Sequence, residues 1–407
     1  MSQKNIREPK AVKRALYFCR YSCDFDAGST LMPGFAAQNK IDLIIAAASN
    51  IGMRFHIMAS PSFAAKEKWN RHKIIRDKKN KVIVIIPWHI GIKNHPRITY
   101  SVNVLFASFY SLFFVMRRKY EKLISYNCVP DTLMPFLSAK MYSRKSTSII
   151  ELEEEVSSDI EAPFLFRIFD YLARVIVPFD GALLSSEGLR NSIKSKNIEI
   201  LNGVIADKNI LNPKREKQDC KKNDKIEILF MGRIDEMRGI TIFLEAATRL
   251  SKILDRIHFR IIGYTPDSGS ARQIATIEKY LKDEKLPIEI QLNVGRHLVD
   301  LALWDSDICV SLVKDKKFLT KSFPSKMIEF LAYNKIVVSQ YICELRHINN
   351  IIWIEDAHVD DVVKAIKQAI TLSSELDKSR RNGRSWALEN CSQNAVSNKL
   401  QKLLCDV

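Results

Sequence analysis

Residues 225–252 read KIEILFMGRIDEMRGITIFLEAATRLSK. An apolar run ends at Gly232, an irregular segment with Arg233 and Arg238 follows, and a helical pattern starts after Gly239. This order predicts a buried β-strand, a loop and an α-helix, which together form one repeating unit of an α/β domain. The two arginines then lie beyond the end of the strand, where open α/β sheets bind their ligands.

The same alternation extends in both directions from this unit. Downstream, strand-like and helical runs follow one another at 258–263, 270–284, 288–294, 297–304, 307–313, 324–334 and 335–340. Upstream, strand-like runs occur at 14–20, 53–60, 82–87, 122–126, 146–152, 181–186 and 198–202, with helical patterns at 33–50 and 130–143 among them. Near-continuous apolar strands separated by helices predict parallel sheets that are covered on both faces. The tail beyond about residue 360 has a helical pattern.

The boundary between two domains is predicted at residues 206–224, ADKNILNPKREKQDCKKND, which are polar and aperiodic like a linker. We therefore expect one doubly wound, Rossmann-like domain over 1–205 and a second over 225–407 that includes C-terminal helices. The length of 407 residues suits two or three domains. Two such domains facing a central cleft would place a ligand at the carboxyl ends of both sheets.

The positive charge is concentrated in the first part of the chain. Residues 1–150 contain 25 Lys and Arg against 8 Asp and Glu, whereas the remaining residues contain 38 of each. A basic face can bind nucleic acid, an anionic membrane or a phosphorylated substrate, and it can also be a solvated surface. No helix-turn-helix, zinc-finger or RNP-like motif is present, so we expect no nucleic-acid partner.

The charge-free run between Arg97 and Arg117 favours the membrane. It approaches spanning length, but its Ser, Thr and Asn residues favour a buried or interfacial helix over a transmembrane one. Arg117, Arg118 and Lys119 follow it directly and would complement anionic headgroups. The N-terminus lacks a long apolar stretch, so we expect no secretory signal. The eight cysteines form no CxxC pair, which fits reduced thiols in a cytoplasmic protein.

The segment 229–240, LFMGRIDEMRGI, has the features of a phosphate site. Gly232 allows close backbone approach, and the guanidinium groups of Arg233 and Arg238 can converge on a diphosphate. Neither a GxGxxG fingerprint nor a P-loop is present, which argues against a dinucleotide-binding enzyme and a P-loop ATPase. Solvated arginines in an ordinary strand–helix turn are the alternative interpretation.

A second candidate site lies at 321–340, KSFPSKMIEFLAYNKIVVSQ. Pro324 fits the first turn of a helix, whose free N–H groups would bind an anion together with Ser322, Ser325 and the Lys326 ammonium. Glu329, one turn further on, could accept hydrogen bonds from a ribose diol. The alternative is a surface ion pair between Lys326 and Glu329.

Five segments of the second half follow one another in a recognisable order: MGRIDEMRGI (231–240), RIIGYTP (260–266), LNVGR (292–296), SDICVSL (306–312) and SFPSKMIEFLAYNKIVVS (322–339). This order resembles the retaining glycosyltransferases of family 4, which have the two-domain GT-B fold. In the first half, ILNGV (200–204) and DAGSTLMPGF (26–35) resemble the family's pre-donor segment and acceptor-side loop, although the usual double glycine is absent.

The resemblance implies a donor site in the second domain. Arg233 would bind the diphosphate, Arg238 stands where the family usually has lysine, and Glu329 matches the glutamate that holds the donor ribose. Lys321 replaces the first glutamate of the E-x7-E motif. The other donor-binding residues implied by the resemblance are Gly232, Ser322, Phe323, Ser325 and Lys326 around the phosphates, Val294 and Gly295 near the nucleobase, and Gly28, Ser29 and Thr30 from the first domain.

The implied reaction transfers a sugar with retention at the anomeric carbon. Cations would stabilise the departing nucleoside diphosphate while the sugar gains oxocarbenium character, so we expect no metal and no cofactor besides the nucleotide-sugar donor. In the acidic segment 151–155, ELEEE, Glu154 is a candidate for orienting the acceptor hydroxyl, against the alternative of a solvated loop.

The expected protein is a hexosyl-type transferase on the inner face of the plasma membrane. Its acceptor would be a lipid-linked saccharide in bacterial-type surface polysaccharide synthesis, such as O-antigen or capsule. Two alternatives remain open: a GT-B protein that binds nucleotide sugar or lipid without transfer, which Lys321 favours, and a GT-B nucleotide-sugar epimerase.

Overall fold

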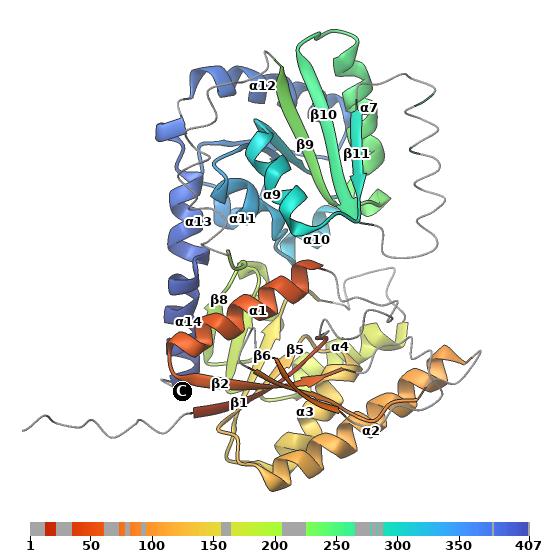
Figure 1. The fold of residues 1–407 in the computed structure, drawn as a ribbon, viewed down its shortest axis with the longest axis vertical. Helices are drawn as coiled ribbons and strands as arrows, with labels where there is room; N and C mark the ends of the chain where they lie inside the picture. Colours follow the sequence, from red (N-terminus) through yellow and green to blue (C-terminus); the bar gives the residue numbers. More distant parts are fainter. Residues whose placement is uncertain are drawn as a thin grey trace, which may run out of the picture. The chain divides into compact units, whose positions relative to one another are not determined.

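The computed structural model describes residues 13–21, 35–60, 73–77, 82–90, 95–155, 164–205, 225–264, 277, 282, 288–376 and 378–405. The chain divides into two compact units (Figure 1). The first comprises residues 1–201 and 396–407, and the second comprises residues 202–395. The segments 206–224 and 270–284, predicted as a linker and a helix, lie outside the described residues except for 277 and 282.

The first unit is built on an eight-stranded sheet in the order β3-β4-β2-β1-β5-β6-β7-β8. Its strands are β1 (Lys13–Cys19), β2 (Met53–Ala59), β3 (Lys73–Asp77), β4 (Val82–Ile86), β5 (Lys122–Tyr126), β6 (Thr147–Leu152), β7 (Gly181–Leu184) and β8 (Asn197–Ile200). All neighbouring strands are parallel except β3, which pairs antiparallel with β4. Strand β3 was not predicted, because it lies inside the lysine-rich stretch 66–81 and has only two apolar residues.

Helices cover both faces of this sheet. One face packs against α2 (Pro96–Arg117), α3 (Pro130–Tyr142) and α4 (Phe164–Ile176), around a core that includes Phe18, Phe114, Phe136 and Ala173. The other face packs against α1 (Phe35–Asn50) and α14 (Gln393–Cys405). A short 3-10 helix, Glu187–Ser192, follows β7. Figure 1 shows α1 and the pair α2–α3 on opposite sides of the strands.

The end of the chain belongs to the first unit, which differs from the boundary 225–407 expected from sequence. In α14, the Ser397 hydroxyl donates to the Ala47 carbonyl at 2.9 Å and the Lys399 ammonium donates to the Ile200 carbonyl at 2.8 Å. Leu403 packs so closely on Gly181 that a Cβ there would lie 2.8 Å from its Cδ1 atom. These contacts join residues distant in sequence, so helical periodicity alone could not assign the segment to a domain.

The second unit has a six-stranded sheet in the order β11-β10-β9-β12-β13-β14, and every described pairing in it is parallel. Its strands are β9 (Ile226–Arg233), β10 (Ile257–Tyr264), β11 (Ile288–Leu292), β12 (Ile308–Ser311), β13 (Ile336–Gln340) and β14 (Ile351–Ile354). Strand β14 was not predicted.

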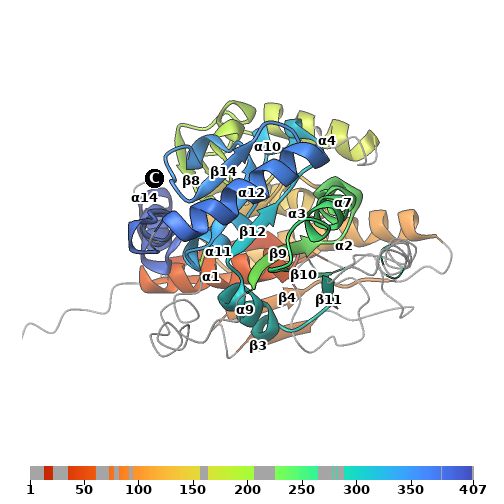
Figure 2. The same cartoon turned by 90° about the horizontal axis from the view of Figure 1, so that it is seen from above.

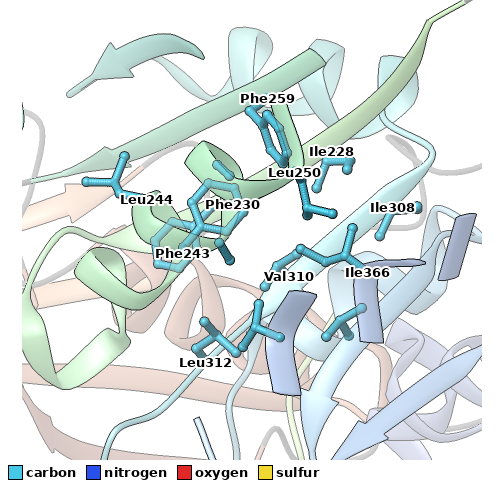
Figure 3. Close-up of a cluster of buried hydrophobic side chains, with 14 of the residues drawn as sticks. Ile228, Phe230, Phe243, Leu244, Leu250, Phe259, Ile308, Val310, Leu312 and Ile366 are labelled. Atoms are coloured by element: carbon cyan, nitrogen blue, oxygen red, sulfur yellow. The ribbon is translucent and has the colours of Figure 1, made fainter. Parts of the chain in front are cut away.

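The core of the second unit explains why residues 225–252 fold as predicted. Helices α7 (Ile240–Ser251) and α12 (Val359–Glu375) pack side by side on one face of the sheet (Figure 2). There the Phe243 ring contacts the rings of Phe230 and Phe259, whose centroids are 5.0 and 5.9 Å from its own; Figure 3 shows the three residues in one cluster. The opposite face carries α9 (Arg296–Asp305), α11 (Lys326–Ala332) and α13 (Gly383–Cys391). Helix α10 (Lys316–Thr320) and the 3-10 turns Glu236–Arg238, Cys343–Leu345 and Lys378–Arg380 complete the described part.

The apolar run 97–117 forms most of α2. This helix is long and apolar enough to cross a membrane, but half of its most apolar stretch is buried inside the protein. Helix α2 packs along α3 and against the sheet, with Phe114 and Val115 in the core. One side of α2 is therefore part of the core of an α/β domain.

Candidate functional site

The carboxyl end of β9 has the irregular geometry that its glycines predict. Gly232 has φ +132° and Gly239 has φ +69°, both in a region that residues with a Cβ rarely adopt. Between them, Asp235 accepts a hydrogen bond from the Arg238 backbone N–H at 2.8 Å and forms an ion pair with Arg233. Asp235 thus fixes the loop and one of the two predicted cations. No role for Asp235 was expected from the sequence.

The predicted cations Arg238 and Lys326 lie in this same region. The Arg238 guanidinium lies over the Phe318 ring, 4.7 Å from its centroid. The Lys326 ammonium donates to the Met231 carbonyl of β9 at 2.7 Å. A Cβ at position 232 would overlap that ammonium, so glycine is the residue that lets the lysine reach the strand end.

The charge of Lys326 is destabilised before any ligand arrives. Burial and the neighbouring Arg238 lower the pKa of this ammonium to about 7, while Asp235 and Glu329 act in the opposite direction. Arg233 also contributes to the lowering. Three cations lie close enough here to repel one another, and a bound anion would reduce this repulsion.

The helix carrying Lys326 starts later than predicted. Helix α11 begins at Lys326 itself, so Pro324 is not in its first turn; the Pro324 carbonyl instead accepts a hydrogen bond from the Met327 N–H at 2.9 Å. Ser325 is exposed and its side chain makes no cap hydrogen bond. With seven residues, this helix offers a weaker anion site than the sequence pattern implied, and the site's charge comes from side chains.

The other residues predicted in the segment 321–340 lie just before α11. Ser322 and Phe323 are buried, with Phe323 in the core beneath α11. The Lys321 backbone N–H donates to the Phe318 carbonyl at 3.1 Å, and its side chain is half-buried.

Glu329 is part of a second charged cluster, which the sequence analysis did not foresee. The Arg296 guanidinium donates to Glu329 Oε1 at 2.8 Å and to Asp300 Oδ1 at 2.9 Å. The Tyr333 hydroxyl also donates to Asp300 Oδ1, at 2.7 Å. Burial opposes the charge on Arg296, but Glu329 and Asp300 outweigh it and raise its pKa.

Arg296 follows the two residues predicted near the nucleobase. Val294 is partly buried against the core, and Gly295 precedes the first turn of α9, where its carbonyl accepts from the Leu298 N–H at 3.0 Å. A signal for Arg296 did exist in the sequence, because LNVGR places an arginine at a helix start beyond a strand. Its pairing with Glu329 needs a contact across 33 residues.

In the first unit, the acidic segment 151–155 is largely neutralised. Glu151 is buried and accepts a hydrogen bond from the Tyr17 hydroxyl, while Lys40 lies 3.4 Å from it and pairs with Glu153. Burial raises the pKa of Glu151 to about 7. Glu154, the predicted acceptor-orienting residue, forms a single β-bridge and is half-buried.

A third polar cluster joins the carboxyl ends of β1 and β2 to the start of α3. Buried Asp131 accepts two hydrogen bonds from the half-exposed Arg20 guanidinium, at 2.8 and 3.0 Å. Ser60 and Tyr100 donate to the same carboxylate at 2.6 and 3.0 Å. Burial opposes the charge, but these partners, Arg20 above all, lower the pKa of Asp131. The cluster therefore holds an arginine at the carboxyl end of the sheet.

The remaining predicted site residues Gly28, Ser29 and Thr30 lie outside the described residues. Among the residues that are described, no three His, Cys, Asp or Glu side chains gather into a possible metal site.

Two Rossmann-like α/β units, each with a parallel sheet at its centre, define the GT-B fold. The chain resembles solved GT-B structures along almost its whole length. A glycosyltransferase from Rickettsia africae ESF-5 is 14% identical, with a TM-score of 0.68 over 98% of this chain and 100% of that one. Sucrose-phosphate synthase from Thermosynechococcus elongatus is 11% identical, with a TM-score of 0.70 over 96% and 98%. Anabaena HepE, solved with UDP and glucose, is 12% identical, with a TM-score of 0.67 over 97% and 99%.

Residues 212–386 match the family described as glycosyl transferases group 1. This match covers the donor-side motifs, and it supports a glycosyltransferase of the GT-B type. No curated protein matches the chain by sequence.

Proposed function

We propose that the chain is a retaining, hexosyl-type glycosyltransferase that transfers a sugar from a nucleotide-sugar donor to a lipid-linked saccharide. The observation that carries the proposal is the gathering of Arg233, Arg238 and Lys326 at the carboxyl end of β9, within the region that matches the family. A diphosphate is the anion that suits three cations best, and HepE was solved with UDP and with UDP-glucose.

The cations would act mainly on the leaving group. As the bond between the anomeric carbon and the diphosphate breaks, negative charge grows on the diphosphate and positive charge grows on the sugar ring. Fixed guanidinium groups stabilise the former without reorganisation, because Asp235 holds Arg233 and Phe318 supports Arg238. In this proposal these side chains supply the charge stabilisation, and no metal or other cofactor takes part.

The donor ribose would lie against α11. Glu329 retains partial exposure, and its carboxylate is fixed by Arg296, so it can accept hydrogen bonds from a diol in a defined direction. The Arg296–Glu329 pairing also supports a second candidate, a GT-B protein that binds nucleotide sugar without transfer. Lys321 supports this candidate too, because it stands where a carboxylate is expected next to the sugar.

The acceptor and the location complete the proposal. The basic first 150 residues and the apolar helix α2 favour an acceptor held at an anionic membrane, on the cytoplasmic side, as in surface polysaccharide synthesis. We assign the protein to the membrane surface rather than to a spanning position, because α2 contributes to the core of the first unit.

Arg233→Ala tests the donor site. Thermal shift with a panel of nucleoside diphosphates and nucleotide sugars would identify the ligand, because a ligand of the native state raises its melting temperature. We expect the variant to lose this shift and to lose sugar transfer while its unliganded melting temperature stays near that of the wild type. Arg249→Ala, at an exposed arginine of α7, is the matched control. If the Arg233→Ala variant shows the same ligand-induced shifts as the wild type, the diphosphate role is contradicted. If the wild-type protein binds nucleotide sugars but shows no turnover, the second candidate is selected.

A further inference from the structure

Helix α4 buries an ion pair and exposes most of its large apolar side chains. Asp170 and Arg174 are buried and bonded to each other at 3.1 Å, and Arg174 also donates to buried Glu155 at 3.2 Å. Ala173 lies in the core, but six large apolar residues face the solvent, and Phe164 and Ile176 are 70% and 68% exposed. The exposed residues of this helix are Phe164, Ile168, Tyr171, Leu172, Val175 and Ile176. A soluble surface helix buries its apolar stripe and exposes its charges.

Helix α2 presents a second apolar stripe. Its inner side contacts α3 and the sheet, whereas Leu105 and Phe109 on its outer side are 64% and 70% exposed. The outer stripe consists of Ile98, Leu105, Phe109, Phe113 and Met116. At 3.6 residues per turn, these five positions fall within an arc of about 80°. They therefore form one continuous line along the helix.

The two stripes belong to the same layer of the first unit. Helices α2, α3 and α4 cover one face of the eight-stranded sheet, and the rings of Tyr100 on α2 and Phe166 on α4 stack with centroids 5.5 Å apart. The outer sides of both helices thus lie on the side away from the sheet. Together they hold eleven of the eighteen large apolar residues that are exposed in the described chain, which scattered surface exposure does not explain.

Cations flank the apolar stripe of α2, and neither α2 nor α4 carries an exposed carboxylate. Residues 95–119 contain no Asp or Glu, and the single acid of α4, Asp170, is buried. Arg97 at one end of α2 and Arg117, Arg118 and Lys119 at the other are exposed. The Arg117 guanidinium lies 4.1 Å from the centroid of the Phe113 ring, so the charge adjoins the apolar stripe directly.

We propose that the outer sides of α2 and α4 form one membrane-docking surface, whose apolar residues enter the headgroup region while the cations of α2 bind anionic lipid headgroups. This names the surface for the membrane partner of the proposed function. The charge pattern favours lipid over a second copy of the chain, because a self-paired interface would bring these cations together with no exposed carboxylate on either helix to neutralise them. Apolar insertion combined with cationic contacts is the pattern of interfacial helices.

Vesicle flotation of the full-length chain tests the surface. The probes are phosphatidylcholine vesicles with and without phosphatidylglycerol. The double variant Phe109→Glu/Ile176→Glu is expected to bind anionic vesicles at least tenfold more weakly than the wild type, and both positions are exposed enough to leave folding intact. The triple variant Arg117→Gln/Arg118→Gln/Lys119→Gln should lose about fivefold per charge removed at low salt. Ile253→Glu, at an exposed isoleucine of the second unit, is the matched control and should bind like the wild type.

The outcomes separate the alternatives. Wild-type binding by the double variant, or no binding of the wild type to either vesicle, overturns the proposal. A wild-type dimer in light scattering that the double variant converts to monomer, with vesicle binding unchanged, assigns the surface to a second copy instead. Nucleotide-induced thermal shifts of the same variants report on the donor site independently, so a failure here leaves the proposed transferase function intact, and the reverse also holds.

Discussion

Lys326 should make nucleotide binding depend on pH. In the empty site, burial and Arg238 lower the pKa of its ammonium to about 7, against an ordinary value of 10.5. A bound diphosphate adds negative charge beside this group, so it stabilises the ammonium and raises its pKa again. The protonated enzyme therefore binds more tightly, and affinity falls as the pH rises through the pKa of the empty site.

The size of the effect follows from the fraction of protonated lysine. About half of the enzyme carries the ammonium at pH 7 and about one part in a hundred at pH 9, which predicts a roughly fiftyfold weaker Kd at the higher pH. The pH range lies above the titration of a terminal phosphate near pH 6, so the ligand does not confound it. At pH 7, binding should also take up about half a proton.

Isothermal titration calorimetry with the best nucleoside diphosphate of the panel measures both quantities, using buffers of different ionisation enthalpy to count protons. Lys326→Met keeps an unbranched side chain of similar length without the charge, so the variant should bind more weakly at pH 7 and show no change in Kd between pH 7 and 9. A wild-type Kd that is constant over this range, or an equal pH dependence in the methionine variant, would refute the reasoning.

Three further predictions concern the surroundings of the two sites. Gly232→Ala should weaken nucleotide binding at least about tenfold because its Cβ displaces Lys326, whereas Gly52→Ala, also at a positive φ but with open space around it, should leave binding unchanged. Arg296→Leu removes charged hydrogen bonds to two carboxylates and should weaken nucleotide binding about tenfold, with partial rescue by lysine; unchanged affinity would exclude a positioning role. Asp131→Asn should lower the free energy of unfolding at pH 7 by about 2 kcal/mol in chemical denaturation. Because the folded state lowers the pKa of this carboxyl, its contribution is present above the unfolded-state value near 4 and is lost as the pH falls, so the wild type and the variant should converge in acid.

The Arg296–Glu329 pair refines what the E-x7-E pattern can mean in this chain. With Lys321 in the first position, the carboxylate expected beside the sugar is replaced by a cation, while the second carboxylate is held by Arg296. The charge at the proposed donor site therefore differs from the one that the resemblance implies. A Lys321→Glu variant reports on this change, because a transferase whose sugar contact was lost should gain turnover from it and a purely binding protein should not.

The sequence by itself determined the alternation of strands and helices, the two-domain α/β class and the strand–helix turns that carry the candidate site residues. These are local properties of the chain. A buried parallel strand is an apolar run, and a strand–helix turn such as 231–240 needs its glycines. The cations next to that turn are read directly from the sequence. The predicted strand ends agree with the structure to within a few residues for this reason.

Tertiary structure decided the rest, because it depends on contacts between residues far apart in the chain. Strand β14 pairs with β13, and α14 is tied to the first unit by the bonds of Ser397 and Lys399 to α1 and β8 and by the packing of Leu403 on Gly181. The pairing of Arg296 with Glu329 likewise joins two helices that no local pattern connects. Helix α4 is amphipathic in sequence, but only packing shows that its buried side includes Asp170 and Arg174, because Glu155 and Asp170 are placed to neutralise Arg174.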